Sequence, residues 1–207
     1  MNWQLNKIQL PVYNLGKGKR IGIWVQGCTL ACPGCLNRTL WNPTGGRSVP
    51  VPALFNWILD HADSYDGISI SGGEPFQQYA PLIAFLHLVK TRTALDVHCF
   101  SGYTLEELLQ RHPDRLFLHY LDSLVDGRYL QNLHDDSGVR GSTNQRLFRI
   151  QDGEAVPTET ALTDTQAPWS FFLDADQDLY MSGIPKKGQL RHLEEELTCQ
   201  GHPKKFK

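Results

Sequence analysis

The sequence of 207 residues lacks an excess of charge of either sign, because 20 Lys and Arg stand against 22 Asp and Glu. Because the charges nearly balance, the electrostatic field of the protein is weak, and we expect neither nucleic acid nor a membrane surface as a partner. No apolar run reaches the roughly 18 residues of a transmembrane helix. The first residues alternate polar and apolar types and show neither the basic nor the apolar segment of a signal peptide. These absences predict a cytoplasmic protein.

The sequence also lacks internal repeats, low-complexity segments and a cysteine framework of the secreted type. It contains five cysteines, an odd number, and three of them fall within eight positions. Thiols stay reduced in the cytoplasm, so crowded cysteines there indicate a metal site or catalysis rather than disulfides.

Apolar runs typical of strands alternate with amphipathic stretches, and this order predicts an α/β fold with a parallel sheet. The expected strands are residues 21–26, 67–71, 95–101 and 115–125, and the expected helices are residues 51–62, 80–91 and 104–112. Thr104 followed by Glu107 is typical of a helix N-cap. Ligands of such sheets bind at the carboxyl ends of the strands.

The character of the chain changes after residue 150. A polar stretch leads to an expected hairpin over residues 169–185, turning at residues 176–178, then to an expected helix over residues 188–197 and a basic end. We therefore predict a core over residues 1–150 and a hairpin-helix appendage over residues 151–207, packed on or beside the core.

Residues 27–37 read GCTLACPGCLN and hold Cys28, Cys32 and Cys35 in a Cys-x3-Cys-x2-Cys pattern. Pro33 and Gly34 interrupt regular structure, which lets three side chains converge. Soft thiolates bind zinc, Cu(I) or iron-sulfur clusters. On a four-iron cluster, three thiolates leave one iron open to a substrate or cofactor.

A structural zinc site would need a fourth protein ligand. Cys99, His98 and Cys199 are the candidates for it, and no second cysteine pair of zinc-knuckle spacing follows in the sequence.

Residues 71–75, SGGEP, end the second expected strand. Gly-Gly is a common way to leave a strand, and on its own it predicts only a turn. Glycine also lets the backbone approach a ligand closely.

The cysteine pattern followed by Gly-Gly-Glu-Pro resembles the radical S-adenosylmethionine superfamily. Residues 100–109 (FSGYTLEELL), 125–129 (VDGRY) and 140–146 (RGSTNQR) resemble segments in matching order of the activating proteins of anaerobic ribonucleotide reductase. The resemblance covers about residues 5–150. It implies a radical SAM core with the fold of a partial, open parallel β/α barrel of five or six strands, since a complete barrel needs about 250 residues.

The resemblance also implies a 4Fe-4S cluster whose open iron binds S-adenosylmethionine, and reductive cleavage of that cofactor to a 5'-deoxyadenosyl radical. The radical would abstract hydrogen from a partner protein, a glycyl radical enzyme, with flavodoxin or ferredoxin as the electron donor. Two alternatives stay open: a radical maturase of another peptide or small molecule, and an iron-sulfur protein that only transfers electrons or stabilises an assembly.

The resemblance assigns residues to the site without naming a catalytic side chain beyond cluster and cofactor. It implies that Glu74 accepts a hydrogen bond from the methionine ammonium. The implied cluster ligands are Cys28, Cys32 and Cys35, and the implied cofactor-binding residues are Gly72, Gly73, Glu74, Pro75, Ser101, Tyr103 and Asp126.

Several assignments have a plainer structural alternative. Ser101 and Tyr103 also suit a turn before the helix at Thr104, and Asp126 also suits a turn. Asp122 is a further candidate to face the cavity. Arg140, Asn144 and Arg146 line either the cavity or the partner groove, or they belong to a solvated loop.

The chain departs from the family at residues 15–20, LGKGKR, where many members have Gly-Pro-Gly. Lys17 and Lys19 there place positive charge near the expected cofactor mouth, facing either a substrate acid or solvent. The added C-terminal residues either cover an open sheet edge or form a docking surface.

Overall fold

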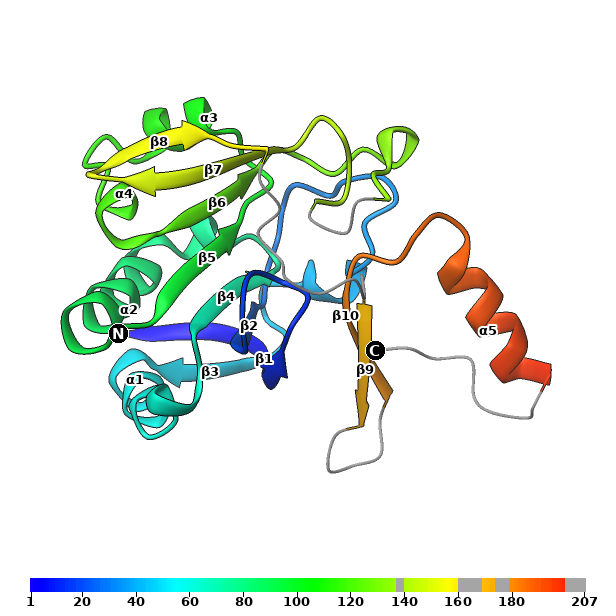
Figure 1. Ribbon diagram of the computed structural model, residues 1–207, viewed down its shortest axis with the longest axis horizontal. Coiled ribbons are helices and arrows are strands. Elements are labelled where there is room, and N and C mark those ends of the chain that lie inside the picture. Colours follow the sequence, from blue (N-terminus) through cyan, green and yellow to red (C-terminus); the bar gives the residue numbers. More distant parts are fainter. Residues whose placement is uncertain (137–139, 160–168, 174–178, 200–207) are drawn as a thin grey trace.

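The computed structural model describes residues 1–136, 140–159, 169–173 and 179–199. Figure 1 shows a large twisted sheet with helices along it and a separate C-terminal hairpin and helix. The strands are β1 (Asn2–Val12), β2 (Arg20–Val25), β3 (Arg47–Pro50), β4 (Gly67–Gly72), β5 (Asp96–Phe100), β6 (Ser123–Asp126), β7 (Arg146–Gln151), β8 (Glu154–Pro157), β9 (Trp169–Leu173) and β10 (Leu179–Gly183). The α-helices are α1 (Val51–Leu59), α2 (Tyr79–Arg92), α3 (Leu105–Arg111), α4 (Phe117–Tyr120) and α5 (Gln189–Cys199).

The large sheet is mixed, with strand order β3-β1-β2-β4-β5-β6-β7-β8. Strands β2, β4, β5 and β6 run parallel, which confirms the α/β class. The parallel set has four strands rather than the expected five or six, because the chain reverses direction at both edges of the sheet. At one edge, Asp152 and Gly153 turn the chain with positive φ angles of 53° and 78°, the geometry of a two-residue hairpin. Barrel closure stays a prediction.

The expected helices and the N-cap are confirmed. The side chain of Thr104 accepts from the backbone N–H of Glu107, and the Glu107 carboxylate accepts from the backbone N–H of Thr104.

Residues 115–125 were expected as one strand, and this is wrong for their first half. Phe117–Tyr120 forms the short helix α4, and in the turn before it the Asp114 side chain accepts from the Leu116 N–H. Phe117 and Leu118 are buried there, so the apolar run serves helix packing before β6 begins.

Alternation along the parallel strands gives the sheet two different faces. On one face, apolar side chains such as Ile68, Ile70 and Val97 pack in a single cluster with α1, α2 and α4 (Figure 1). On the opposite face, the intervening positions include Ser69 and His98, both buried. The helices therefore cover one face, and polar groups gather on the other.

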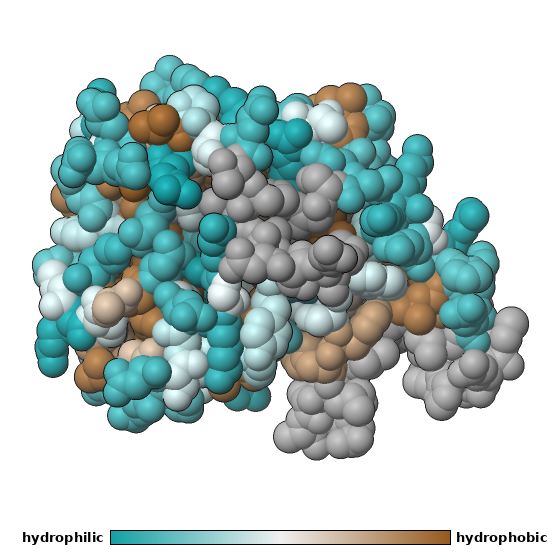
Figure 2. All heavy atoms as spheres, viewed as in Figure 1, coloured by the Kyte–Doolittle hydropathy of each residue, from teal (hydrophilic) through white to brown (hydrophobic). Residues whose placement is uncertain are grey.

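The C-terminal strands β9 and β10 pair antiparallel in a second sheet. The hairpin contacts the core: the Asn14 side chain donates to the Ser182 carbonyl at 2.8 Å, and the Lys7 ammonium lies 4.0 Å from the Tyr180 ring centre. Figure 2 shows tan and brown side chains over this hairpin. The expected turn at residues 176–178 and the basic end at residues 200–207 lie outside the described residues. The boundary between core and appendage stays a prediction.

Among the helices in the described part of the chain, none has the length and apolar character needed to cross a bilayer.

Candidate metal and cofactor site

Loops after β2, β4, β5 and β6 meet at the carboxyl ends of the parallel strands, where the strand order predicts a ligand site. In Figure 1 the arrowheads of β4, β5 and β6 point toward this edge. The loops enclose an open cavity of about 190 Å³. Of the sequence-predicted residues, its walls contain Cys28, Cys32, Cys35, Gly72, Gly73, Glu74 and Ser101.

The Gly72-Gly73 turn lies directly on the strand that leads to the cysteines. Gly72 has a φ of +106°, and a Cβ on it would lie 2.6 Å from backbone atoms of Val25. A Cβ on Gly73 would lie 2.2 Å from the carbonyl oxygen of Gly27. Backbone bonds from Gly73 N–H to Val25 O and from Glu74 N–H to Gly27 O join the two segments. Only glycine permits this approach, which fixes the turn against the start of the cysteine loop.

The three cysteines are free thiols, half-buried in the cavity wall. A turn closed by the Cys35 N–H to Cys32 O bond at 3.1 Å, with Gly34 at a φ of +79°, brings the last two together. Burial raises the pKa of Cys28 and of Cys32. Such thiols ionise readily only beside positive charge, which a bound metal centre supplies.

The described residues contain no group of three or more His, Cys, Asp or Glu side chains positioned to hold a single metal ion. The cysteine thiols instead line the walls of one cavity. The candidate fourth zinc ligands lie elsewhere: Cys99 is buried in the core beneath the helices, and His98 lines a different cavity. The side chain of Cys199 lies outside the described part of the structure.

Glu74 is 1% exposed and joins two loops of the site. Its carboxylate accepts from the Gly102 N–H at 2.7 Å, the Ser101 hydroxyl at 2.9 Å and the Phe76 N–H at 3.1 Å. Burial raises the pKa of Glu74 to about 7, although these hydrogen bonds act to lower it. A carboxylate offers about four acceptor positions, so three internal bonds leave room for a ligand donor.

Other predicted cofactor contacts have internal roles in this structure. Ser101 is buried and also accepts from the Tyr103 N–H at 3.1 Å. Tyr103 packs in the main core, where its hydroxyl accepts from Gln77 at 2.9 Å. Pro75 is buried and is the first residue of the 3₁₀ turn Pro75–Gln78. A direct cofactor contact of these residues stays a prediction.

Asp126 is fully buried and has its acceptor positions occupied. It accepts from the Leu105 N–H at the start of α3 and from the backbone and guanidinium of Arg146. Arg146 also pairs with Glu106 at 2.7 Å. Neither Asp126 nor Arg146 lines the cysteine cavity, so their observed contacts support α3 and β7.

The remaining polar candidates bond to neighbours in the fold. Asp122 pairs with Lys90 at 2.8 Å, Arg140 pairs with Asp135 at 2.6 Å, and the Asn144 amide donates to the carbonyl of Arg128. Neither these three candidates nor their three bonding partners line the cysteine cavity.

Sequence reasoning missed Gln77 and Gln145. Gln77 accepts from the Thr29 N–H and donates to the Thr29 hydroxyl, which ties the cysteine loop to the turn after Glu74. Gln145 lines the cavity and accepts from the Gly141 N–H. Gln145 falls within the segment RGSTNQR, which already carried the family resemblance, but an isolated glutamine gives no signal of its own.

The model of the family described as "4Fe-4S single cluster domain" matches residues 14–148, a range that includes all three cavity cysteines. The fold and the site therefore define an iron-sulfur cluster protein of the α/β class.

Relatives at higher similarity make the class more specific. Proteins named "Anaerobic ribonucleoside-triphosphate reductase-activating protein" are 34% identical over 66% of this chain and 91% of theirs in Haemophilus influenzae, and 32% identical over 67% and 88% in Enterobacteria phage T4. The protein of that name in Escherichia coli (strain K12) is 31% identical over 66% of this chain and 92% of its own. The chain belongs to the family of these activating proteins.

A solved structure, that of QueE from Escherichia coli, is also similar. It aligns with a TM-score of 0.40 and 18% identity, covering 50% of this chain and 54% of QueE.

Proposed function

We propose that this chain activates an anaerobic ribonucleotide reductase by generating a glycyl radical on it. The relatives are named for that activation, and this chain spans about nine-tenths of their length. The observation that supports the proposal most directly is one cavity lined both by three free thiols and by the Gly72-Gly73-Glu74 turn. Reduced flavodoxin or ferredoxin is the electron donor that we expect.

The residues of the cavity fit a cluster with an open side. Thiolates are the usual protein ligands of iron-sulfur clusters, and Cys28, Cys32 and Cys35 would hold it. Among the described residues that line the cavity there is no fourth cysteine, and the lining includes several glycines and the buried carboxylate of Glu74. When bound, the cluster would supply one electron for reductive cleavage of S-adenosylmethionine.

The protein orients that cofactor and keeps water away from it. Gly72 and Gly73 would let its methionine portion approach the backbone, and Glu74 would accept a hydrogen bond from its ammonium group. A positive ligand beside Glu74 would also stabilise the ionised carboxylate, whose pKa burial has raised.

Replacement of single cysteines tests the proposal. Anaerobically reconstituted protein should bind about four irons, the content of one 4Fe-4S cluster, and show a reduced EPR signal that changes when S-adenosylmethionine is added. Cys28→Ala, Cys32→Ala or Cys35→Ala should each abolish both. Cys99→Ala, the matched control in the core, should keep both.

Two outcomes would contradict the proposal. Stoichiometric zinc without iron uptake would make the site a zinc centre. A loaded cluster whose EPR signal ignores S-adenosylmethionine would indicate an electron-transfer or structural protein.

A further inference from the structure

A row of polar residues crosses the sheet face that the helices leave uncovered. The strand register places Ser69 beside His98, His98 beside Ser123, and Ser123 beside Arg149, one residue on each of four neighbouring strands. The first three are buried, and polar groups are costly to bury unless they form hydrogen bonds. Each of these buried polar side chains therefore needs a hydrogen-bond partner.

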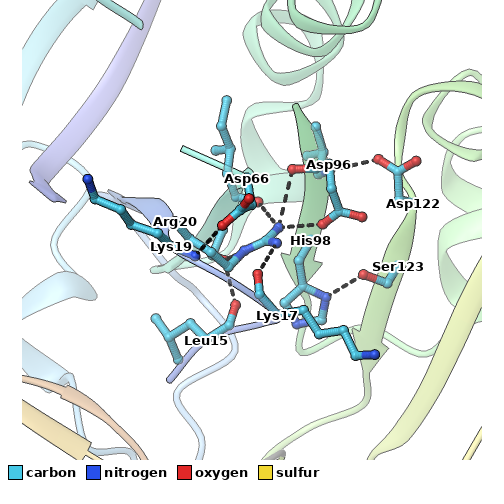
Figure 3. A network of polar contacts seen from close by, with 12 residues as sticks. Leu15, Lys17, Lys19, Arg20, Asp66, Asp96, His98, Asp122 and Ser123 are labelled. Atoms are coloured by element: carbon cyan, nitrogen blue, oxygen red, sulfur yellow. Dashed lines mark hydrogen bonds and ion pairs between the residues drawn. The ribbon is translucent and has the colours of Figure 1, made fainter. Parts of the chain in front are cut away.

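Part of the row is held by Arg20, which is 1% exposed and lies at the centre of the network in Figure 3. Its guanidinium donates to the Ser69 hydroxyl at 2.6 Å, to the carbonyl of Lys17 at 2.9 Å, and to the Asp96 carboxylate at 2.6 Å. These bonds hold residues 15–19 against the amino ends of the parallel strands. They account for Ser69 but not for the other end of the row.

That other end opens into a second cavity, of about 410 Å³, which is a size typical of small-molecule sites. Its walls include Lys17, His98, Ser123 and Arg149. Lys17 was expected near the cofactor mouth, and this is wrong. It lies at the amino ends of the strands, because Arg20 holds its loop there.

The side chains around this cavity have an excess of positive charge that is not paired. Both acidic side chains in its walls already have cationic partners: Asp96 pairs with Arg20 at 2.6 Å, and Asp122 pairs with Lys90 at 2.8 Å. Lys17 and Arg149 form no ion pair with any residue that the structure describes. Two uncompensated positive charges therefore face the same cavity.

His98 adds a ring nitrogen, Nε2, in a fixed orientation to the site. Its Nδ1 lies 2.7 Å from the Ser123 hydroxyl, which fixes the orientation of the ring. Its Nε2 forms no hydrogen bond within the described part of the chain, although the residue is only 2% exposed. The imidazole thus presents one nitrogen to a ligand.

We propose that this cavity binds the carboxylate or phosphate group of a small molecule, with Lys17 and Arg149 as cationic partners and His98 Nε2 as a hydrogen-bond partner. Phe100, two residues beyond His98 on β5 and on the same face, lines the cysteine cavity. Successive residues on one face are about 7 Å apart, so the two cavities are neighbours along one strand. The proposal is independent of the radical chemistry.

Calorimetric titration of the full chain, anaerobic and at low ionic strength, tests the proposal with two probes. Pyrophosphate represents phosphate ligands and citrate represents carboxylate ligands. At least one should bind saturably at a single site, and the comparison shows which chemistry the site prefers. Lys17→Ala and Arg149→Ala should each weaken binding about tenfold, the usual effect of losing one charge-assisted hydrogen bond at an accessible site.

Lys19→Ala is the matched control, because the Lys19 ammonium lies over the Tyr65 ring at 4.5 Å and does not line this cavity. It should bind the probes as the unchanged protein does. The proposal is wrong if neither probe binds, or if the Lys17→Ala/Arg149→Ala double variant binds as tightly as the unchanged chain. Iron content, measured on the same samples, should stay constant, which separates this result from any failure of the cluster assignment.

Discussion

Glu74 is the single residue that joins most parts of the candidate site. Its carboxylate bonds to the loop after β5 through Ser101 and Gly102, while its backbone N–H bonds to Gly27 ahead of the cysteines. A hydrogen bond to a charged group is worth about 1.5 to 3 kcal/mol, more than a neutral one. The same side chain can therefore order the loops of the site and recognise a cationic ligand.

The raised pKa of Glu74 predicts a dependence of stability on pH. The unfolded carboxyl ionises near its ordinary pKa of 4.5, whereas the folded one keeps its proton up to about 7. Between these values the folded state binds more protons, so the free energy of unfolding falls as pH rises, by about 3 kcal/mol for this group. Urea unfolding of the cofactor-free chain at pH 5 and pH 8 measures the change.

Glu74→Gln should remove this contribution, so the stability difference between the two proteins should change with pH. A constant difference would mean that Glu74 is ionised throughout. The same variant should bind S-adenosylmethionine about tenfold to hundredfold more weakly while its cluster stays loaded. Glu154→Gln, at an exposed position on β8, is the matched control and should change neither property.

At the scale of elements, the site depends on how the loop after β4 meets the loop after β2. The turn is fixed by two backbone bonds and by two glycines whose Cβ atoms would overlap Val25 and Gly27. The following 3₁₀ turn carries Gln77, which bonds to Thr29 next to the first cysteine. One short connection thus positions both the cysteine loop and Glu74.

Gly73→Ala should displace the cysteine loop, since its Cβ would lie 2.2 Å from a backbone oxygen that cannot move without the loop. We expect iron binding after reconstitution to fall several-fold, with a loss of about 1 to 3 kcal/mol in stability, the usual cost of overpacking. Iron analysis and thermal unfolding measure the two effects.

Gly127→Ala is the control for Gly73→Ala at the same site. Gly127 also lines the cavity, yet a Cβ there would meet its nearest atom at 3.7 Å, an ordinary contact. Its φ of +98° makes alanine unfavourable in the backbone without pushing on the cysteine loop. If both variants bind iron equally, the close approach at Gly73 does not position the cysteines.

At the scale of the whole molecule, the C-terminal hairpin closes part of the sheet face that the helices leave open. The Lys7 ammonium on β1 lies between rings of the core and the hairpin, 5.1 Å from Trp24, 4.9 Å from Phe172 and 4.0 Å from Tyr180. Asn14 is buried and bonds to Ser182 on β10. These contacts favour a structural role for the hairpin over a free docking surface.

Deletion of residues 158–207 should therefore destabilise the core. Exposing large apolar side chains such as Trp24 costs about 1.5 to 3 kcal/mol each, a large part of a typical stability of 5 to 15 kcal/mol. We expect a lower unfolding temperature and aggregation, measured by calorimetry and light scattering.

The opposite result has a clear meaning. A soluble truncated chain that keeps its cluster and cleaves S-adenosylmethionine, but no longer activates the reductase, would make the appendage a partner-binding surface.

The sequence by itself determined helices α1, α2, α3 and α5, strands β2, β4 and β5, and the chemistry of the cysteine loop, because these depend on local spacing. Cys28, Cys32 and Cys35 lie within one loop, and Thr104 and Glu107 lie within one helical turn. The α/β class followed from the alternation of such local patterns.

Only the tertiary structure decided what depends on residues distant in sequence. The antiparallel edge strands, the bonds that occupy Asp126 and the position of Lys17 come from pairings across tens of residues, such as Arg20 with Asp96. The polar row from Ser69 to Arg149 exists only through strand register, which spacing along the chain does not encode. A buried carboxylate or an unpaired cation is likewise a property of packing, because its neighbours decide its charge balance.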